Sequence, residues 1–314
     1  MRKLAALGLL AVLTTGCGTA PGPAAVAELP PLPAGAEQPF DHFRRDALAT
    51  IEKADLTFFL DCLAAAGYPQ EREVSLGPAP VLPALAAAPL SPRTEADARK
   101  YGFGAPLLAQ PANVVRKDPA FTQAARGCER SARAMFGAPD EVGRVRSLYA
   151  DLGNKLVQER SARTTEIING KSGELTACFA AQGYRVKSGE QFSARGDLSQ
   201  FGIQTGTHEN PVAPPFRRPV GLSAGVQIEP PVPARKYIPT AAEVKFAVAF
   251  VRCGVRTGLF AEIDKRQPEI QQAIVERHAA EFAALNPAVD QIARDAAAVL
   301  KKRPDQPMQP RPGA

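Results

Sequence analysis

Thirty prolines divide this chain of 314 residues into segments that can form helices and segments that cannot. Twenty-seven of the prolines fall in four stretches, 18–39, 69–119, 185–239 and 303–314. Because proline lacks a backbone N–H and clashes with the preceding helical turn, these stretches cannot form regular helices. Hydrophobic residues make up 45% of the whole chain, as in an ordinary globular protein. The sequence therefore predicts a mainly α-helical body joined by long proline-rich loops.

Apolar residues in the proline-poor segments recur every three or four positions, which is the period of a helix with one buried face. This pattern predicts helices over residues 48–66, 118–136 and 140–170. A fourth helix opens at Thr240 and Glu243, whose hydroxyl and carboxylate would form a capping box and each accept a hydrogen bond from a backbone N–H.

The fourth predicted helix is apolar on most of its circumference, including a stripe of valines that extends to Val255. A helix of this kind is typical of the centre of a protein, so we expect it to lie there. We also expect Pro268 to kink or restart the helix and Pro287 to begin a final short helix, because proline disrupts a helix interior.

Two copies of one short pattern, each at the end of a predicted helix, indicate an internal duplication. Residues 62–68 read Cys-Leu-Ala-Ala-Ala-Gly-Tyr and residues 178–184 read Cys-Phe-Ala-Ala-Gln-Gly-Tyr, so five of seven positions are identical. In each half an aromatic residue followed by glycine comes next, and then a helix with a second cysteine, Cys128 or Cys253. We therefore expect two helical pseudo-repeats that follow one plan.

The four cysteines of the two repeats are expected to form two disulfides. The simplest pairing consistent with the repeat plan is Cys62 with Cys128 and Cys178 with Cys253, one of the three connectivities that four cysteines allow. Metal binding is the competing use of cysteine, but the chain has no Cys-x-x-Cys and its three histidines lie near none of the cysteines. We therefore expect no metal site and no other cofactor, in a mainly α-helical, disulfide-braced domain.

The N-terminal residues have the form of a lipoprotein signal peptide. Arg2 and Lys3 precede an uncharged run over residues 4–13, which at ten residues is too short to cross a bilayer. Residues 13–17, Leu-Thr-Thr-Gly-Cys, resemble the lipobox of bacterial lipoproteins. The resemblance implies that Cys17 receives a diacylglyceryl group and becomes the first residue after cleavage. This modification would place the protein at the cell membrane, lipid-anchored on its extracytoplasmic face.

These patterns divide the chain into five parts. We expect a signal peptide at 1–16, a lipid-anchored tether rich in Pro and Ala at 17–39, helical pseudo-repeats at 40–139 and 140–303, and a disordered tail at 304–314. Cleavage before the lipobox cysteine leaves 36 basic and 32 acidic residues, a mild net charge of +4. No local cluster of Lys and Arg marks a nucleic-acid surface. The expected partners are the membrane, through the anchor, and an envelope protein or an anionic wall polymer.

The arrangement as a whole resembles a group of uncharacterised actinobacterial lipoproteins. The resemblance rests on the lipobox, the Cys-x-Ala-Ala-x-Gly-Tyr pattern at 178–184, the Gly-Cys-Glu at 127–129 and the Arg-Cys at 252–253. It covers residues 40–280 loosely. This chain has no Trp, whereas relatives often place one just ahead of the third cysteine. The resemblance implies location and architecture only, because no activity is established for that group.

The two long proline-rich loops, within 69–119 and 185–239, are our hypothesis for a recognition surface. Each is about 50 residues long, whereas the usual connection has about 4 to 6. Long loops on a rigid scaffold are where binding sites usually lie. We expect residues 70–90 to serve recognition and to be dispensable for stability. The alternative is that these loops simply wrap the helices.

Two other functions compete with a non-enzymatic binding role. Residues 221–225 read Gly-Leu-Ser-Ala-Gly, which matches the nucleophile elbow of a serine hydrolase around Ser223, with Asp264 and His278 following in triad order. That elbow needs a strand before the serine and a helix after it, whereas prolines flank this segment on both sides. We therefore expect no catalytic site. The remaining alternative is a small-molecule carrier, which would need a roomy apolar pocket.

The lipobox generates a first testable prediction. In protein purified from its own membrane, Cys17 should carry the diacylglyceryl group, because the lipobox thiol is the acylated atom. A Cys17→Ser variant has no thiol to acylate and should leave the membrane fraction. Peptide mass spectrometry and membrane fractionation measure the two effects. An unmodified Cys17 in membrane-bound wild-type protein would contradict the prediction.

Overall fold

The structure is a computed structural model, and it describes residues 29–33, 35–71, 85, 92–109, 113–116, 119–187, 198–210, 226–229 and 232–302. Within these residues the chain is mainly α-helical, as the proline pattern predicts. The helices are α1 (Arg45–Ala65), α3 (Glu95–Tyr101), α4 (Pro119–Arg133), α5 (Pro139–Gly170), α6 (Ser172–Ala181), α7 (Ala241–Arg256), α8 (Leu259–Arg277) and α9 (Ala279–Lys302). Short 3-10 helices are η1 (Pro39–His42), η2 (Pro69–Glu71) and η3 (Leu198–Phe201). The strands are β1 (Asn113–Arg116), β2 (Thr207–His208), β3 (Val226–Glu229) and β4 (Tyr237–Ile238).

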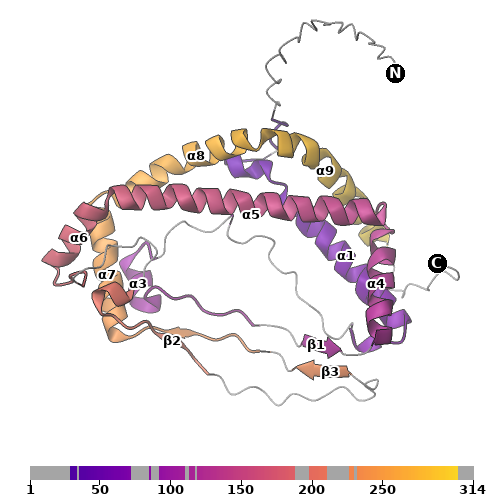
Figure 1. The fold of residues 1–314 in the computed structure, drawn as a ribbon, viewed down its shortest axis with the longest axis horizontal. Coiled ribbons are helices and arrows are strands. Elements are labelled where there is room, and N and C mark those ends of the chain that lie inside the picture. Colours follow the sequence, from indigo (N-terminus) through magenta and orange to yellow (C-terminus); the bar gives the residue numbers. More distant parts are fainter. Residues whose placement is uncertain are drawn as a thin grey trace, which may run out of the picture.

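Three helices form the long side of the molecule (Figure 1). α5 has 32 residues and is therefore about 48 Å long, and α8 and α9 lie along it as an arch. The buried residues of α5 recur at spacings of three and four and so form one stripe: Val142, Val145, Tyr149, Leu152 and Leu156. This stripe and the buried faces of α8 and α9 belong to one hydrophobic core.

A disulfide lies toward each end of α5. Cys62 and Cys128 link α1 to α4 at one end, and Cys178 and Cys253 link α6 to α7 at the other (Figure 1). This is the pairing that the repeat plan predicts. The two bridges join residues 66 and 75 positions apart, and bridges that close loops of this size typically contribute about 2 to 4 kcal/mol to stability.

The two Cys-x-Ala-Ala-x-Gly-Tyr segments end their helices in the same way. Gly67 and Gly183 have positive φ angles of 98° and 88°. The N–H of the following residue, Tyr68 or Tyr184, donates to the carbonyl five residues earlier at 2.9 Å in both segments. This is a Schellman helix end, and glycine fits it because it has no Cβ to oppose a positive φ. The duplicated pattern therefore specifies a cysteine-bearing helix with a fixed stop.

The two halves of the chain are interleaved in space. α1 from the first half packs against α9 from the second, and α3 packs against α7. Phe103, which follows α3, lies 5.9 Å from the ring of Phe246 and 5.4 Å from that of Phe250, both on α7. Phe201, from the corresponding aromatic-glycine pair of the second half, also contacts Phe246, at 4.6 Å. Both aromatic-glycine pairs therefore lie at the α7 end, and the halves share one core.

A buried polar chain fixes the segment before α1 to α5 and α9. The Tyr149 hydroxyl accepts a hydrogen bond from the backbone N–H of Arg44 at 2.6 Å and donates one to Asn286 Oδ1 at 2.8 Å. Asn286 Nδ2 in turn donates to the carbonyl of His42 at 3.0 Å, and Phe43 stacks on Tyr149. Burial raises the pKa of Tyr149, so its hydroxyl keeps the proton that it donates. We call residues 39–44, held in this way, the latch.

Two expectations about where helices begin are wrong. The break between α7 and α8 lies at Gly258, which has a φ of 68°, whereas Pro268 lies inside α8. α9 begins at Ala279 and continues through Pro287, so it is not a short helix that starts there. Buried apolar residues on both sides of each proline offset the cost of proline in a helix interior, about 3 kcal/mol.

The widely apolar helix α7 lies at one end of the molecule rather than at its centre (Figure 1). It is nevertheless well buried, because α3, α6 and α8 all pack against it. Its predicted stripe of valines stops short of Val255, which is 67% exposed. Apolar residues on most of its circumference therefore reflect how many elements surround this helix, not its position in the whole molecule.

The described positions within and beside residues 70–90 pack on the folded body, which argues against our expectation that this segment is dispensable for stability. Leu85 is 7% exposed and belongs to the core, and its carbonyl accepts a hydrogen bond from the buried Arg160 at 3.0 Å. Glu71 is also buried. At these positions the loop packs on the helices, as the alternative interpretation held. Residues 72–84 and 86–91 lie outside the described residues.

The interleaving predicts that neither half folds alone. A fragment of residues 140–303 lacks α1, which covers α9, and α3, which covers α7, so it should expose both faces and show no cooperative thermal transition. Circular dichroism during heating measures this, with residues 29–303 as the control. A fragment that melts cooperatively within a few degrees of the control would show that the second half has a core of its own.

Candidate functional site

The described parts of the two proline-rich loops pair with each other. β1 from the first loop is antiparallel to β3 from the second, and Leu107 forms an antiparallel bridge with Arg235. The backbone N–H groups of Leu107 and Arg235 donate to each other's carbonyls at 2.9 and 3.0 Å. Segments that cannot form helices still have backbone polar groups to satisfy, and here each loop supplies partners for the other.

We call these paired segments the strap, which comprises residues 105–109, 113–116, 226–229 and 232–238. In Figure 1 the strap crosses the molecule on the side opposite to α8 and α9, from the α7 end toward the α4 end. At the α7 end β2 adds a short antiparallel pairing with β4, through Thr207 with Ile238 and His208 with Tyr237. Two stretches far apart in the sequence thus pair side by side.

One buried carboxylate attaches the strap to α7. Glu243 is fully buried, and it accepts hydrogen bonds from the backbone N–H of Phe103 at 2.8 Å and of Gly206 at 2.6 Å. The Tyr237 hydroxyl donates to the same carboxylate, 3.1 and 2.9 Å from its two oxygens. Hydrogen bonds to an ionised acceptor are about twice as strong as neutral ones, so these donors offset the cost of burying the charge. Burial and the bond to Glu243 raise the pKa of Tyr237, which keeps the phenol protonated.

The predicted capping box at the start of α7 is half right. Thr240 Oγ1 accepts a hydrogen bond from the N–H of Glu243 at 3.0 Å, as expected. The Glu243 carboxylate, however, binds the backbone of Phe103 and Gly206, which are 140 and 37 residues away in sequence. These donors come from two loops, so a pattern confined to four residues could not reveal them.

Glycines allow the backbone to approach this carboxylate closely. Gly102 has a φ of 58°, and a Cβ built there would lie 2.5 Å from Glu243 Oε1. A Cβ at Gly206 would lie 2.1 Å from the carbonyl oxygen of Ile238. Any larger residue at either position would push the donor away from its acceptor. The glycine of the aromatic-glycine pair that ends α3 thus lets the backbone N–H of Phe103 reach a buried carboxylate.

Exposed apolar side chains gather on the strap. In the part of the chain that the structure describes, the exposed large hydrophobic residues are Leu32, Leu107, Leu108, Met135, Leu148, Val232, Ile238 and Val255. Four of these eight lie on the strap, and Leu108 is 74% exposed. Isolated exposed apolar residues are ordinary, but half of those described here lie on the strap.

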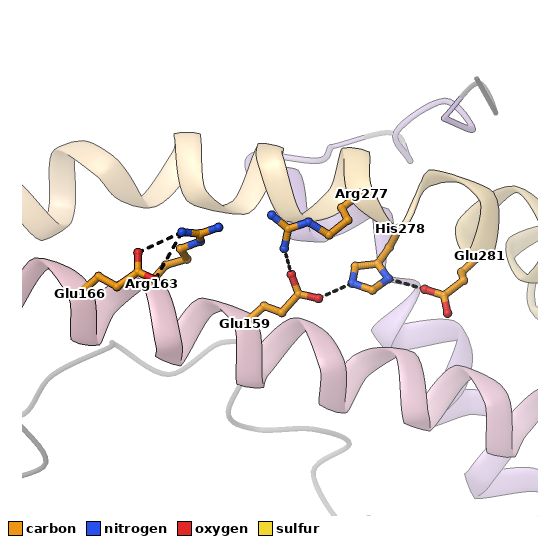
Figure 2. A network of polar contacts seen from close by, with 6 residues as sticks. All are labelled: Glu159, Arg163, Glu166, Arg277, His278 and Glu281. Carbon is orange, nitrogen blue, oxygen red and sulfur yellow. Dashed lines mark hydrogen bonds and ion pairs between the residues drawn. The ribbon is translucent and has the colours of Figure 1, made fainter. Parts of the chain in front are cut away.

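A second polar cluster joins α5 to the junction of α8 and α9 (Figure 2). His278 Nε2 lies 2.6 Å from Glu159 on α5, and its Nδ1 contacts Glu281 on α9. Arg277 also pairs with Glu159, and Lys155 lies 2.6 Å from Glu281. Burial raises the pKa of Glu281, but the hydrogen bonds from Lys155 and His278 outweigh it and lower the pKa overall. Because a carboxylate faces each ring nitrogen, the imidazole connects helices and has no nitrogen free for catalysis.

The residues that follow Ser223 in triad order are not brought together. Asp264 forms an ion pair with Arg93, and His278 binds carboxylates of α5 and α9. Fourteen helical positions separate Asp264 from His278, which corresponds to roughly 20 Å along α8. Ser223 itself lies outside the described residues.

A pocket of about 430 Å³ lies beside the latch. Phe40, Phe43 and Leu85 line it together with the charged Arg44 and Asp46. Its volume falls in the range of small-molecule sites, which is about 300 to 1,000 Å³, but such sites are mainly apolar. The mixed lining therefore gives little support to the carrier interpretation.

Cys17 and the tail at 304–314 lie outside the described residues. No helix in the described ranges combines the length and the apolar character needed to cross a membrane. No group of three or more His, Cys, Asp or Glu side chains in those ranges is arranged to hold a metal ion. No protein family, curated protein or solved structure matches this chain.

Sequence reasoning missed Glu243 as the residue that positions the strap. One indication was available, because Glu243 shares a helix face with Phe246 and Phe250, three and seven residues further on. An acid on such an apolar face must find buried donors or remain unburied. The sequence alone does not identify those donors, since they belong to distant loops.

A Glu243→Gln substitution should lower the free energy of unfolding by about 1 to 3 kcal/mol, because an amide nitrogen cannot accept the hydrogen bonds that one carboxylate oxygen accepts. Hydrogen exchange at the amides of Phe103 and Gly206 should become faster. Denaturant unfolding and exchange mass spectrometry measure the two effects. Glu269→Gln, at an exposed position on α8, is the control and should change neither. Unchanged exchange at both amides in Glu243→Gln would contradict the proposed role.

Proposed function

We propose that this protein is a lipid-anchored, extracytoplasmic protein of the cell envelope that binds a protein partner through its strap and has no enzymatic activity. The lipobox at residues 13–17 supports the anchor. The two disulfides are consistent with an oxidising compartment outside the cytoplasm. The observation that carries the binding role is the pairing of two proline-rich loops into one surface with exposed apolar side chains.

Attachment of the strap to a braced helical body supports binding rather than simple connection. Glu243 holds the strap to α7, the helix that the disulfide of Cys178 and Cys253 joins to α6. A surface that is ordered before binding loses less conformational entropy when a partner arrives. Unpaired loops of this length would have to be ordered by the partner itself. The arrangement therefore favours a preformed recognition surface.

The chemistry of the strap favours a protein partner over an anionic wall polymer. An anionic polymer is recognised by several exposed cations. Among the strap residues whose exposure is described, Lys236 is the one exposed charged residue, whereas Leu107, Leu108, Val232 and Ile238 are exposed apolar residues. Burial of apolar side chains is the main source of affinity between proteins.

The proposal is tested by photocrosslinking on living cells, with a photoreactive amino acid at Ala109. The strap variant replaces the four exposed apolar residues with serine: Leu107→Ser, Leu108→Ser, Val232→Ser and Ile238→Ser. The control variant replaces two exposed apolar residues outside the strap, Leu148→Ser and Val255→Ser. The yield of crosslinked protein should fall at least tenfold in the strap variant and stay unchanged in the control. Melting temperatures of both should stay within a few degrees of wild type, because the changes are on the surface.

Two outcomes would contradict the proposal. Equal crosslinking in the strap variant and the wild type would show that these side chains do not bind the partner. A crosslinked product whose added mass is removed by wall hydrolases would show that the partner is a wall polymer and not a protein.

A further inference from the structure

The latch fixes the place where the chain leaves the folded body. Leu29 packs against the core, and Arg44 donates a hydrogen bond to the carbonyl of Pro31 at 3.1 Å. Arg44 also pairs with Asp290 of α9 at 3.4 Å, and η1 packs against α8. In Figure 1 the described chain therefore begins beside the arch of α8 and α9, on the side of the molecule opposite to the strap.

The part of the tether that precedes Leu29 is short. Eleven residues, 18–28, separate Leu29 from Cys17. Whatever their conformation, a chain of this length spans at most about 40 Å. The body is larger than this reach in one direction, because α5 alone is about 48 Å long.

The depth of the folded body separates the strap from Leu29, where the chain leaves the body. α7 extends from its junction with α8 toward the strap, and its 16 residues are about 24 Å long (Figure 1). If the strap faced the membrane, residues 18–28 would have to pass the arch, which is one helix or about 10 Å thick, and then this depth. They would thus have to span about 34 Å of their maximum of about 40 Å, which few conformations of a chain allow.

We propose that the latch orients the anchored protein, so that the arch of α8 and α9 faces the membrane and the strap faces away from it. This inference rests on the proposed lipid anchor at Cys17. It also specifies the kind of partner, since a strap directed outward meets a protein domain that stands in the space beyond the membrane surface. A segment embedded in the same membrane would not reach it.

The charges on the arch are consistent with an orientation set by the length of the tether. Its exposed residues include Lys265 and Arg294 but also Glu269 and Glu276. A surface of mixed charge is neither strongly attracted to nor repelled by lipid headgroups, so screening by salt should leave the orientation unchanged.

The experiment measures how close each side lies to a bilayer. Two full-length, lipidated variants, Leu108→Cys on the strap and Ala284→Cys on α9, are labelled with a donor fluorophore. The native cysteines do not react, because four are in disulfides and Cys17 would be acylated. The proteins are bound to phosphatidylcholine vesicles with an acceptor fluorophore on the headgroups. Energy transfer from the α9 position should be at least twice that from the strap position, at both low and high salt.

A variant with twenty Gly and Ser residues inserted after Ala24 provides the matched test of the tether. The insertion leaves the latch and the core unchanged, but the longer linker lets the body turn, so the two positions should give similar energy transfer. Equal transfer from both positions without the insertion, in protein that floats with the vesicles, would overturn the orientation alone. Protein that fails to float, like the Cys17→Ser variant, would overturn the proposed anchor and this inference with it.

Discussion

The buried carboxylate of Glu243 is the interaction on which the rest of the arrangement depends. Three separate stretches of chain, which contribute Phe103, Gly206 and Tyr237, meet on α7 because each donates to this one acid. A buried carboxylate without such donors would carry a penalty of several kcal/mol, so it is stable there only while the strap is in place. The strap, in turn, is attached to α7 through the same acid. The stability of this end of the body and the geometry of the strap therefore depend on the same hydrogen bonds.

The proline-rich loops show how a sequence that excludes regular helices can still be ordered. Proline removes backbone donors, so a loop rich in it has little internal means of satisfying its backbone. In this chain the residues between the prolines, around Leu107, Arg235 and in β1 and β3, form hydrogen bonds across to the other loop. Leu85 adds a core contact from within the first loop. The helical body and the loops are thus stabilised by each other.

The features that sequence predicted correctly are those determined by short segments. Gly67 and Gly183 end their helices because the local backbone needs a positive φ, and the cysteines next to these ends pair as the repeated plan predicts. The packing of α1 against α9 and the donors to Glu243 were not predictable, because they join residues far apart in the chain. The expectations that a helix restarts at Pro268 and begins at Pro287 are wrong for a related reason. Their local cost is real, but burial by distant elements offsets it.

The contact between the first and last helices sets the order in which the body can be completed. Cys62 and Cys128 belong to a segment that a chain exported from its N-terminus delivers early, whereas the partner of Arg44, Asp290, lies 246 residues further on. Contacts between residues so far apart slow folding, because a large loop must close before they form. The latch therefore gains its contacts with Asn286 and Asp290 only when nearly the whole chain has emerged. For a chain anchored at its N-terminus, the last step of folding would take place beside the membrane surface.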